Sequence, residues 1–226
     1  GGYAACIIDA SADLDKAAAR VTFGAFYGAG QSCISVQRVY IHESVYDAFM
    51  TKFVQATKAL KGGNLLDDKT FIGPCIAPEE TDRVMTWVKE AIAKGASVES
   101  GATNQGNVMT PTILSNLPSD CTLAKNEAFG PVCNVEKFSD LSTVIEKINT
   151  SDFGLQAGIF TSNIQHAFQA YKQLEVGGLV VNDVPSARVD SMPYGGIKDS
   201  GVGREGVKFA MDDMTELKVM LMKDLL

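Results

Sequence analysis

Short apolar runs alternate with helix-period segments along most of the chain, and this alternation restricts the fold more than any other feature. Strands are expected over residues 4–8, 38–42, 98–100, 108–114, 132–138, 157–160 and 179–182. Helices are expected over residues 13–25, 44–60, 78–94, 139–149 and 162–174. Strands that are joined through helices pair in parallel. The sequence therefore predicts an α/β fold with three layers, in which helices flank a mostly parallel sheet.

Polar residues mark where these helices are expected to begin. Their side chains accept hydrogen bonds from the free N–H groups of a first helical turn. The expected N-caps are Ser11, Ser44, Ser139 and Ser162, and Ser44 with Asp47 and Ser162 with Gln165 have the spacing of a capping box. Pro78 is expected to open the third helix, because the first turn tolerates its missing N–H.

The chain is expected to divide into one domain over residues 1–210 and a tail over residues 211–226. In the tail, Leu217, Val219 and Leu221 recur at every second position, which predicts an edge strand over residues 215–222. An open strand edge favours pairing with a second chain. We therefore expect a C-terminal oligomerisation strand and a homo-oligomer of at least two subunits.

The charge and hydropathy of the chain argue against several classes of protein. Among 226 residues the formal net charge is −7, which is unfavourable for broad binding to a nucleic-acid backbone. No apolar run approaches the roughly 20 residues that cross a bilayer, and no secretory signal is recognised. The sequence predicts a cytoplasmic protein without membrane or nucleic-acid partners. It begins with Gly1 rather than Met, so a piece of a longer protein is expected.

Five cysteines are spread widely along the chain, namely Cys6, Cys33, Cys75, Cys121 and Cys133. An odd number without a CxxC pair argues against a disulfide framework, and two histidines offer no zinc-ligand spacing. We therefore expect reduced thiols and no metal site. Cys6, Cys121 and Cys133 lie in or beside apolar runs, which favours buried structural thiols. For Cys75, which lies in a loop, both roles stay open.

Cys33 ends a glycine-rich turn, Gly28-Ala29-Gly30-Gln31-Ser32-Cys33, between the first expected helix and the second expected strand. Such a turn can expose a thiol beside free backbone N–H groups. A nucleophilic cysteine needs access to substrate and donors that stabilise a thiolate or an oxyanion. On spacing alone, a small buried cysteine remains the alternative.

Segments that follow one another along the chain resemble signatures of the aldehyde dehydrogenase superfamily. Residues 26–33 resemble its cysteine signature, residues 125–132 its glutamate–phenylalanine loop, residues 152–155 its YGL segment, residues 177–183 its GxVxVND strand, and residues 193–205 its PFGGxKxSGxGRE loop. Together these segments span nearly the whole chain. The resemblance is to the catalytic domain of these enzymes.

The resemblance implies an oxidoreductase that converts a small aldehyde to its carboxylic acid with NAD or NADP. Cys33 would add to the aldehyde and form a thiohemiacetal and then a thioester, and its N–H would supply half of the oxyanion hole. Glu127 would accept hydrogen bonds from the nicotinamide ribose, and Phe129 would pack against the nicotinamide ring. The choice of nucleotide, and of water or coenzyme A as acyl acceptor, stays open.

Parts of that family's machinery are expected outside this chain. Its general-base glutamate precedes the Gly-Gly pair and would lie before Gly1, and its dinucleotide-binding domain lies upstream. We therefore expect the chain alone to bind NAD(P) weakly and to turn over no aldehyde. Residues 201–206 match GxGxxG, but they follow a loop rather than a strand, which argues against a dinucleotide-binding fingerprint.

Arg188 lies between the last expected strand and the glycine-rich loop. Residues 182–196 resemble the branch of the family that acts on small polar or anionic aldehydes such as lactaldehyde or phosphonoacetaldehyde. A guanidinium suits the oxygens of a carboxylate or phosphonate. The alternative is a surface ion pair of Arg188 with Asp183 or Asp190.

Two other functions stay open at this point. A cysteine hydrolase or acyltransferase would need a base beside Cys33, but neither His42 nor His166 forms a recognisable dyad motif with it. A non-catalytic domain of the same superfamily, kept for assembly, is the second alternative.

Overall fold

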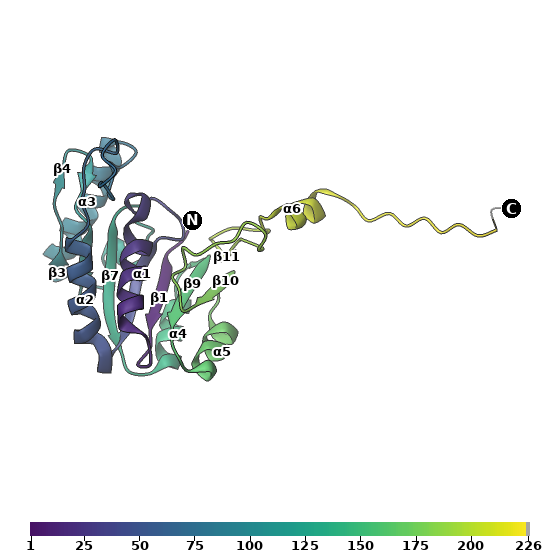
Figure 1. The fold of residues 1–226 in the computed structure, drawn as a ribbon, viewed down its shortest axis with the longest axis horizontal. Coiled ribbons are helices and arrows are strands. Elements are labelled where there is room, and N and C mark those ends of the chain that lie inside the picture. The colour runs from purple at the N-terminus through teal and green to yellow at the C-terminus, as the bar shows by residue number, and fades with distance from the viewer. Residues whose placement is uncertain (225–226) are drawn as a thin grey trace.

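A seven-stranded sheet forms the centre of the computed structural model, which describes residues 1–224 (Figure 1). The strand order is β10-β9-β1-β2-β7-β6-β3. The strands are β1 (Ala4–Ile8), β2 (Val36–His42), β3 (Ser97–Ser100), β6 (Thr112–Ser115), β7 (Val132–Phe138), β9 (Gln156–Phe160) and β10 (Gly178–Val181). All neighbours pair in parallel except β3, which runs antiparallel to β6. The predicted mostly parallel sheet is confirmed.

Helices cover both faces of this sheet. The helices are α1 (Leu14–Phe26), α2 (Tyr46–Lys58), α3 (Pro78–Ala93), α4 (Leu141–Asn149), α5 (Ile164–Gln173) and α6 (Val207–Met214). On one face, α1 and α2 bury Phe26 and Phe53 in a cluster with Ile8. On the other face, α4 and α5 enclose Ile7 in a second cluster. Successive strand residues point to opposite faces, so β1 is buried on both sides, as a central parallel strand requires.

Three helices begin one or two residues later than expected, because Asp and Asn cap them in place of Ser. Asp13 accepts from the Lys16 N–H, Asp140 from Thr143, and Asn163 from Gln165. The predicted caps Ser11, Ser139 and Ser162 were therefore wrong. The expected capping box at Ser44 was also wrong: residues Glu43–Val45 form a short 3₁₀ turn, and the His42 side chain accepts from the Ser44 N–H.

The expected extended piece over residues 108–114 is divided into two strands. β5 (Val108–Met109) pairs with β4 (Asn104–Gln105) in a small hairpin, and β6 joins the main sheet. Pro111 lies between them, and proline cannot donate to a strand ladder. A further two-stranded sheet joins β8 (Phe153–Gly154) to β11 (Ile197–Lys198), which ties the end of the chain to the main body.

The C-terminal part differs most from the expectation. Residues 207–214 form α6, which was not predicted, and residues 215–222 form no strand within the single chain. Figure 1 shows this tail leaving the body as an extended segment, and Leu217, Val219 and Leu221 are exposed. A strand requires a partner for its backbone groups, and the described residues of this chain offer none there. Among residues 1–224, no helix is long and apolar enough to cross a membrane.

Candidate active site

Loops that lie far apart in the sequence meet at the amino ends of neighbouring strands. Gly2 precedes β1, Cys33 precedes β2, Gly130 precedes β7, and Leu155 precedes β9. Cys33 packs against Leu155, and its carbonyl oxygen lies so close to Gly2 that any Cβ there would overlap with it. Open α/β sheets commonly bind ligands at the carboxyl ends of their strands, whereas this cluster occupies the opposite rim.

The Cys33 turn has the geometry of a presented nucleophile. After α1 the backbone of Gly28, Ala29 and Gly30 takes positive φ values of 57°, 56° and 68°, which reverses the chain. Cys33 is half-buried, and its Sγ lies 3.1 Å from the Tyr194 hydroxyl oxygen. Within the described residues the Cys33 N–H has no hydrogen-bond acceptor, so this N–H is available to an oxyanion.

The other four cysteines are buried and free. Burial raises the pKa of the Cys6 and Cys133 thiols far above the ordinary value, so both stay protonated and inert. Burial also raises the pKa of Cys121. The prediction of structural thiols at these three positions is confirmed, and Cys75, which was left open, is buried as well.

Glu127 and Cys33 lie on either side of the same pair of glycines. A Glu127 carboxylate oxygen accepts from the Gly2 N–H at 2.9 Å, and Gly2 packs on the Cys33 carbonyl. The second oxygen of Glu127 lies next to Gly1. The structure thus brings together the predicted nucleophile, Cys33, and the predicted cofactor-binding carboxylate, Glu127, which are 94 positions apart.

Phe129 has a strained backbone and an exposed ring. Its φ is 47°, in the left-handed region that a bulky residue rarely adopts, and its side chain is 41% exposed. Such strain persists where the surroundings enforce it, often at binding sites. The next residue, Gly130, packs on Gly30 of the cysteine turn. The backbone at Phe129 therefore lies beside the Cys33 turn.

Two side chains that were not predicted fix the backbone of the Glu127–Phe129 loop. The buried Gln37 of β2 accepts from the Ala128 N–H at 3.2 Å. Arg83 of α3 donates to the Ala128 carbonyl at 2.8 Å. Both backbone groups of Ala128 are thus held from outside the loop. Neither Gln37 nor Arg83 carries a local sequence signal, because both contacts depend on how the strands and helices assemble.

Arg188 packs on the aromatic ring whose hydroxyl contacts Cys33. Its guanidinium carbon stands 4.1 Å from the centroid of the Tyr194 ring, and one of its Nη atoms donates to Glu205 at 3.0 Å. Arg188 does form an ion pair, as the alternative expected, but in the described residues its partner is Glu205 rather than Asp183 or Asp190, and Asp183 binds Arg20 at 2.6 Å. Arg188 is thus turned toward the ring that contacts Cys33.

Cys33, Tyr194 and Glu205 line a cavity of about 410 Å³ together with residues of the glycine-rich loop. A volume of this size admits a small molecule rather than a polymer. Residues of α6 also line it, so the unpredicted helix closes one side of the cavity. Within residues 1–224, no group of three His, Cys, Asp or Glu side chains is arranged to hold a metal ion.

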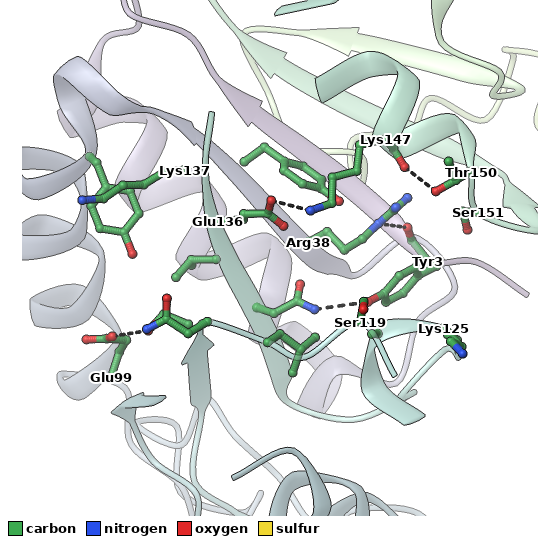
Figure 2. Close-up of a pocket in the computed structure, with 18 of the residues that line it drawn as sticks. Tyr3, Arg38, Glu99, Ser119, Lys125, Glu136, Lys137, Lys147, Thr150 and Ser151 are labelled. Atoms are coloured by element: carbon green, nitrogen blue, oxygen red, sulfur yellow. Dashed lines mark hydrogen bonds and ion pairs between the residues drawn. The ribbon is translucent and has the colours of Figure 1, made fainter. Parts of the chain in front are cut away.

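A larger groove of about 1040 Å³ lies away from Cys33, over strands β2 and β7 (Figure 2). Lys147 forms an ion pair with Glu136 in this groove, and the buried Arg38 donates to the Tyr3 carbonyl at 3.0 Å. Burial raises the pKa of Tyr3 to about 12, so its hydroxyl stays a donor and binds the Leu123 carbonyl. The Tyr3 hydroxyl thus ties the start of the chain to the segment that leads into the Glu127 loop.

The sequence model of the aldehyde dehydrogenase family matches residues 1–220. The chain belongs to the aldehyde dehydrogenase family. It is 46% identical over 222 residues to 3-sulfolactaldehyde dehydrogenase from Priestia aryabhattai, covering 98% of this chain and 46% of that protein. It is 40% identical over 225 residues to lactaldehyde dehydrogenase from Methanococcus vannielii, covering 100% of this chain and 48% of that protein.

Solved structures of this aldehyde dehydrogenase family share the fold. Aldehyde dehydrogenase 21 from Physcomitrella patens, in complex with the reaction product succinate, superposes with a TM-score of 0.94 at 44% identity, covering 100% of this chain and 47% of that one. Glyceraldehyde-3-phosphate dehydrogenase from Methanocaldococcus jannaschii, complexed with NADP, gives a TM-score of 0.93 at 39% identity, with coverages of 96% and 47%. The chain spans about half the length of the curated relatives it matches.

Proposed function

We propose that the protein carrying this chain oxidises a small, anionic aldehyde to its carboxylic acid with NAD or NADP, through a covalent intermediate on Cys33. The observation that carries the proposal is the arrangement at the amino ends of the strands. A half-exposed thiol, a free N–H and the Glu127–Phe129 loop converge there. The names of the relatives and the family membership point to the same reaction class.

The first step belongs to Cys33. Its thiolate attacks the aldehyde carbon, a C–S bond forms, and the carbonyl electron pair moves to oxygen. The Cys33 N–H then donates to this oxyanion, since within the described residues it has no other acceptor. A thiolate suits the reaction because it is a strong nucleophile and, when the resulting thioester is cleaved, a good leaving group.

The Glu127–Phe129 loop fits a nicotinamide cofactor. Bound NAD(P) would supply the two-electron acceptor that converts the thiohemiacetal into a thioester. Glu127 is a carboxylate with lone pairs beyond the one that Gly2 uses, so it can accept hydrogen bonds from ribose hydroxyls. Phe129 offers an exposed ring on a backbone that its neighbours hold in place, and an aromatic face can stack on a planar ring.

Arg188 is the residue we propose for the anionic end of the substrate. It stands one aromatic ring from the nucleophile, and only one of its Nη atoms is used by Glu205 in the described residues. A guanidinium has five N–H donors, so it can bind a carboxylate, sulfonate or phosphonate beside that acid. Relatives are named for 3-sulfolactaldehyde and sulfoacetaldehyde, both of which carry a sulfonate.

A hydrolase or acyltransferase that uses a Cys–His dyad is less well supported. His166 Nδ1 lies 3.1 Å from Asp9, in the segment after β1, at the opposite end of the strands from Cys33. His42 is the last residue of β2, whereas Cys33 precedes that strand, and it binds Ser44. Neither imidazole can take a proton from the sulfur in this geometry.

We further infer a cytoplasmic protein that forms oligomers through its C-terminal tail. All five cysteines are free thiols, which suits a reducing compartment. The exposed apolar side chains of residues 215–222 need a partner surface.

Competitive labelling with iodoacetamide tests the proposed role of Cys33. The chain is labelled at neutral pH, digested, and each of the five cysteines is quantified by mass spectrometry. We expect fast and selective modification of Cys33, because the other thiols are buried. Cys33→Ser should abolish aldehyde oxidation by the complete protein while leaving the thermal unfolding midpoint unchanged. Uniformly slow labelling of all five cysteines would instead favour a non-catalytic assembly domain.

A further inference from the structure

We infer that the Tyr194 hydroxyl is a catalytic hydrogen-bond donor, which holds Cys33 as a thiolate and orients its sulfur toward the cavity. This inference rests on the proposed function, in which Cys33 is the nucleophile. The Tyr194 oxygen lies 3.1 Å from the Cys33 sulfur, within the range of a hydrogen bond to sulfur. Within the described residues, no other polar group bonds to this sulfur.

Tyr194 is placed rigidly enough for this role. Its backbone N–H and carbonyl form an isolated antiparallel bridge with Glu205, at 3.1 and 2.6 Å. Its side chain is buried in a small cluster with Ile34 and Leu155, against which Cys33 packs. Arg188 covers the ring face and is itself held by Glu205. Glu205 thus supports both the backbone and, through Arg188, the ring.

The chemistry of the pair favours donation from oxygen to sulfur. Burial, and then the contact with Cys33, raise the pKa of Tyr194 well above the ordinary value, so the hydroxyl keeps its proton at neutral and moderately alkaline pH. A protonated phenol beside a thiolate can only donate. Hydrogen bonds to charged groups are stronger than those between neutral groups, so such a bond stabilises the thiolate. The same bond makes the sulfur a weaker nucleophile, because thiolate reactivity falls as the thiolate is stabilised.

The hydrogen bond thus increases the fraction of thiolate but lowers its reactivity. In a Tyr194→Phe variant, the dependence of the Cys33 alkylation rate on pH should therefore differ from that of the wild type in opposite ways at neutral and at high pH. At pH 7, where the thiolate fraction limits the rate, alkylation of Cys33 by iodoacetamide should be slower by about threefold to tenfold. At high pH, where every accessible thiol is ionised, the variant should be as fast as the wild type or faster by about threefold. A merely structural role for the hydroxyl would lower the rate at all pH values or at none.

The experiment measures the alkylation rate of Cys33 against pH in the wild type, Tyr194→Phe and a matched control. The control is Tyr171→Phe, which removes a hydroxyl from an exposed position of α5 and should leave the profile unchanged. Phenylalanine has the size and shape of tyrosine, and circular dichroism checks that both variants fold. Profiles in which the variant is slower at pH 7 and equals or exceeds the wild type at high pH support the inference. Superimposable profiles, or a constant ratio at every pH, overturn it.

The proposed function is judged separately from Tyr194. The selectivity for Cys33 over the other four cysteines in the wild type decides whether Cys33 is the reactive thiol. The ratio of the Cys33 alkylation rates of the wild type and Tyr194→Phe, measured as a function of pH, decides whether the tyrosine donates to the Cys33 sulfur.

Discussion

Gly30 and Gly130 pack so closely that a side chain on Gly30 would overlap with the Gly130 carbonyl oxygen. The contact joins the turn that carries Cys33 to the loop that carries Glu127 and Phe129. Gly30 also has a φ of 68°, where a Cβ is unfavourable. Two requirements therefore fall on one residue: a left-handed backbone and the absence of a side chain.

Gly30→Ala should lower the free energy of unfolding by about 2 to 4 kcal/mol, because it adds a steric overlap to the backbone strain. Urea unfolding monitored by circular dichroism measures this. Gly28→Ala is the matched control, since Gly28 has a φ of 57° but open space around it. We expect Gly28→Ala to lower the free energy of unfolding by about 1 to 2 kcal/mol, because it adds backbone strain but no steric overlap. Equal losses in the two variants would show that the contact with Gly130 does not matter.

Arg188→Ala should raise the KM for an anionic aldehyde about 10- to 100-fold, and leave the KM for a neutral aldehyde of similar length nearly unchanged. The reason is the loss of a charge-assisted bond, which contributes about 1.5 to 3 kcal/mol. Steady-state kinetics of the complete protein measure both values. Arg20→Ala, which breaks the ion pair with Asp183, is the control and should affect neither. A similar rise for both aldehydes would remove the anion-binding role of Arg188.

Asp9→Asn should destabilise the protein at neutral pH but not in acid. Burial acts to raise the pKa of Asp9, but hydrogen bonds from Thr161, Ser11 and His166 outweigh it and hold the pKa below the ordinary value. The stabilisation is therefore fully present above about pH 4 and is lost as the pH falls through the lowered value. We expect a loss of about 1 to 3 kcal/mol at pH 7. Urea unfolding across pH, with the exposed Asp68→Asn as control, checks this. A difference that persists below pH 2 would contradict it.

Residues 215–222 should drive self-association. Leu217 and Leu221 are fully or largely exposed, so replacing both with Glu leaves the body of the fold untouched and removes apolar surface from the tail. We expect the wild type to form at least a dimer and the double variant to shift toward monomer, as measured by light scattering. Lys218→Ala is the control within the same segment. A monomeric wild type at micromolar concentration would count against an oligomerisation tail.

The sequence predicted the sheet well, because buried parallel strands are continuous apolar runs. β1 and β7 have the expected bounds, and β2, β9 and β10 differ by one or two residues at their ends. Helix starts were less well predicted. Ser, Asp and Asn cap with similar strength, so Ser11 and Asp13 compete, and the assembled chain decides between them. Asp13 caps the helix because Ser11 is bound to Asp9.

The candidate site was predicted only in part. Cys33, Glu127, Phe129 and Arg188 were proposed as site residues from segments that resemble the family, and the structure places Cys33 and Glu127 on the same pair of glycines. Tyr194 lies within one of those motifs, but its contact with Cys33 spans 161 positions, and no local pattern encodes it. The same holds for Gln37 and Arg83, whose partner is a backbone group. The fate of the tail could not be predicted either, since its alternation specifies an edge but not the strand that pairs with it.

Cys33, Glu127 and Tyr194 all lie at the amino ends of the strands. The two ends of the sheet should therefore differ in how well they tolerate insertions. At the carboxyl rim, hydrogen bonds to Asp9 join the turns, and in the described part of the chain the residues of this network form no hydrogen bond with Cys33. Turns on that rim, such as residues 42–45, are places where an inserted peptide or an affinity tag should leave the proposed reaction intact. An insertion of equal length in the turns before β2 or β7 would separate the groups that have to meet.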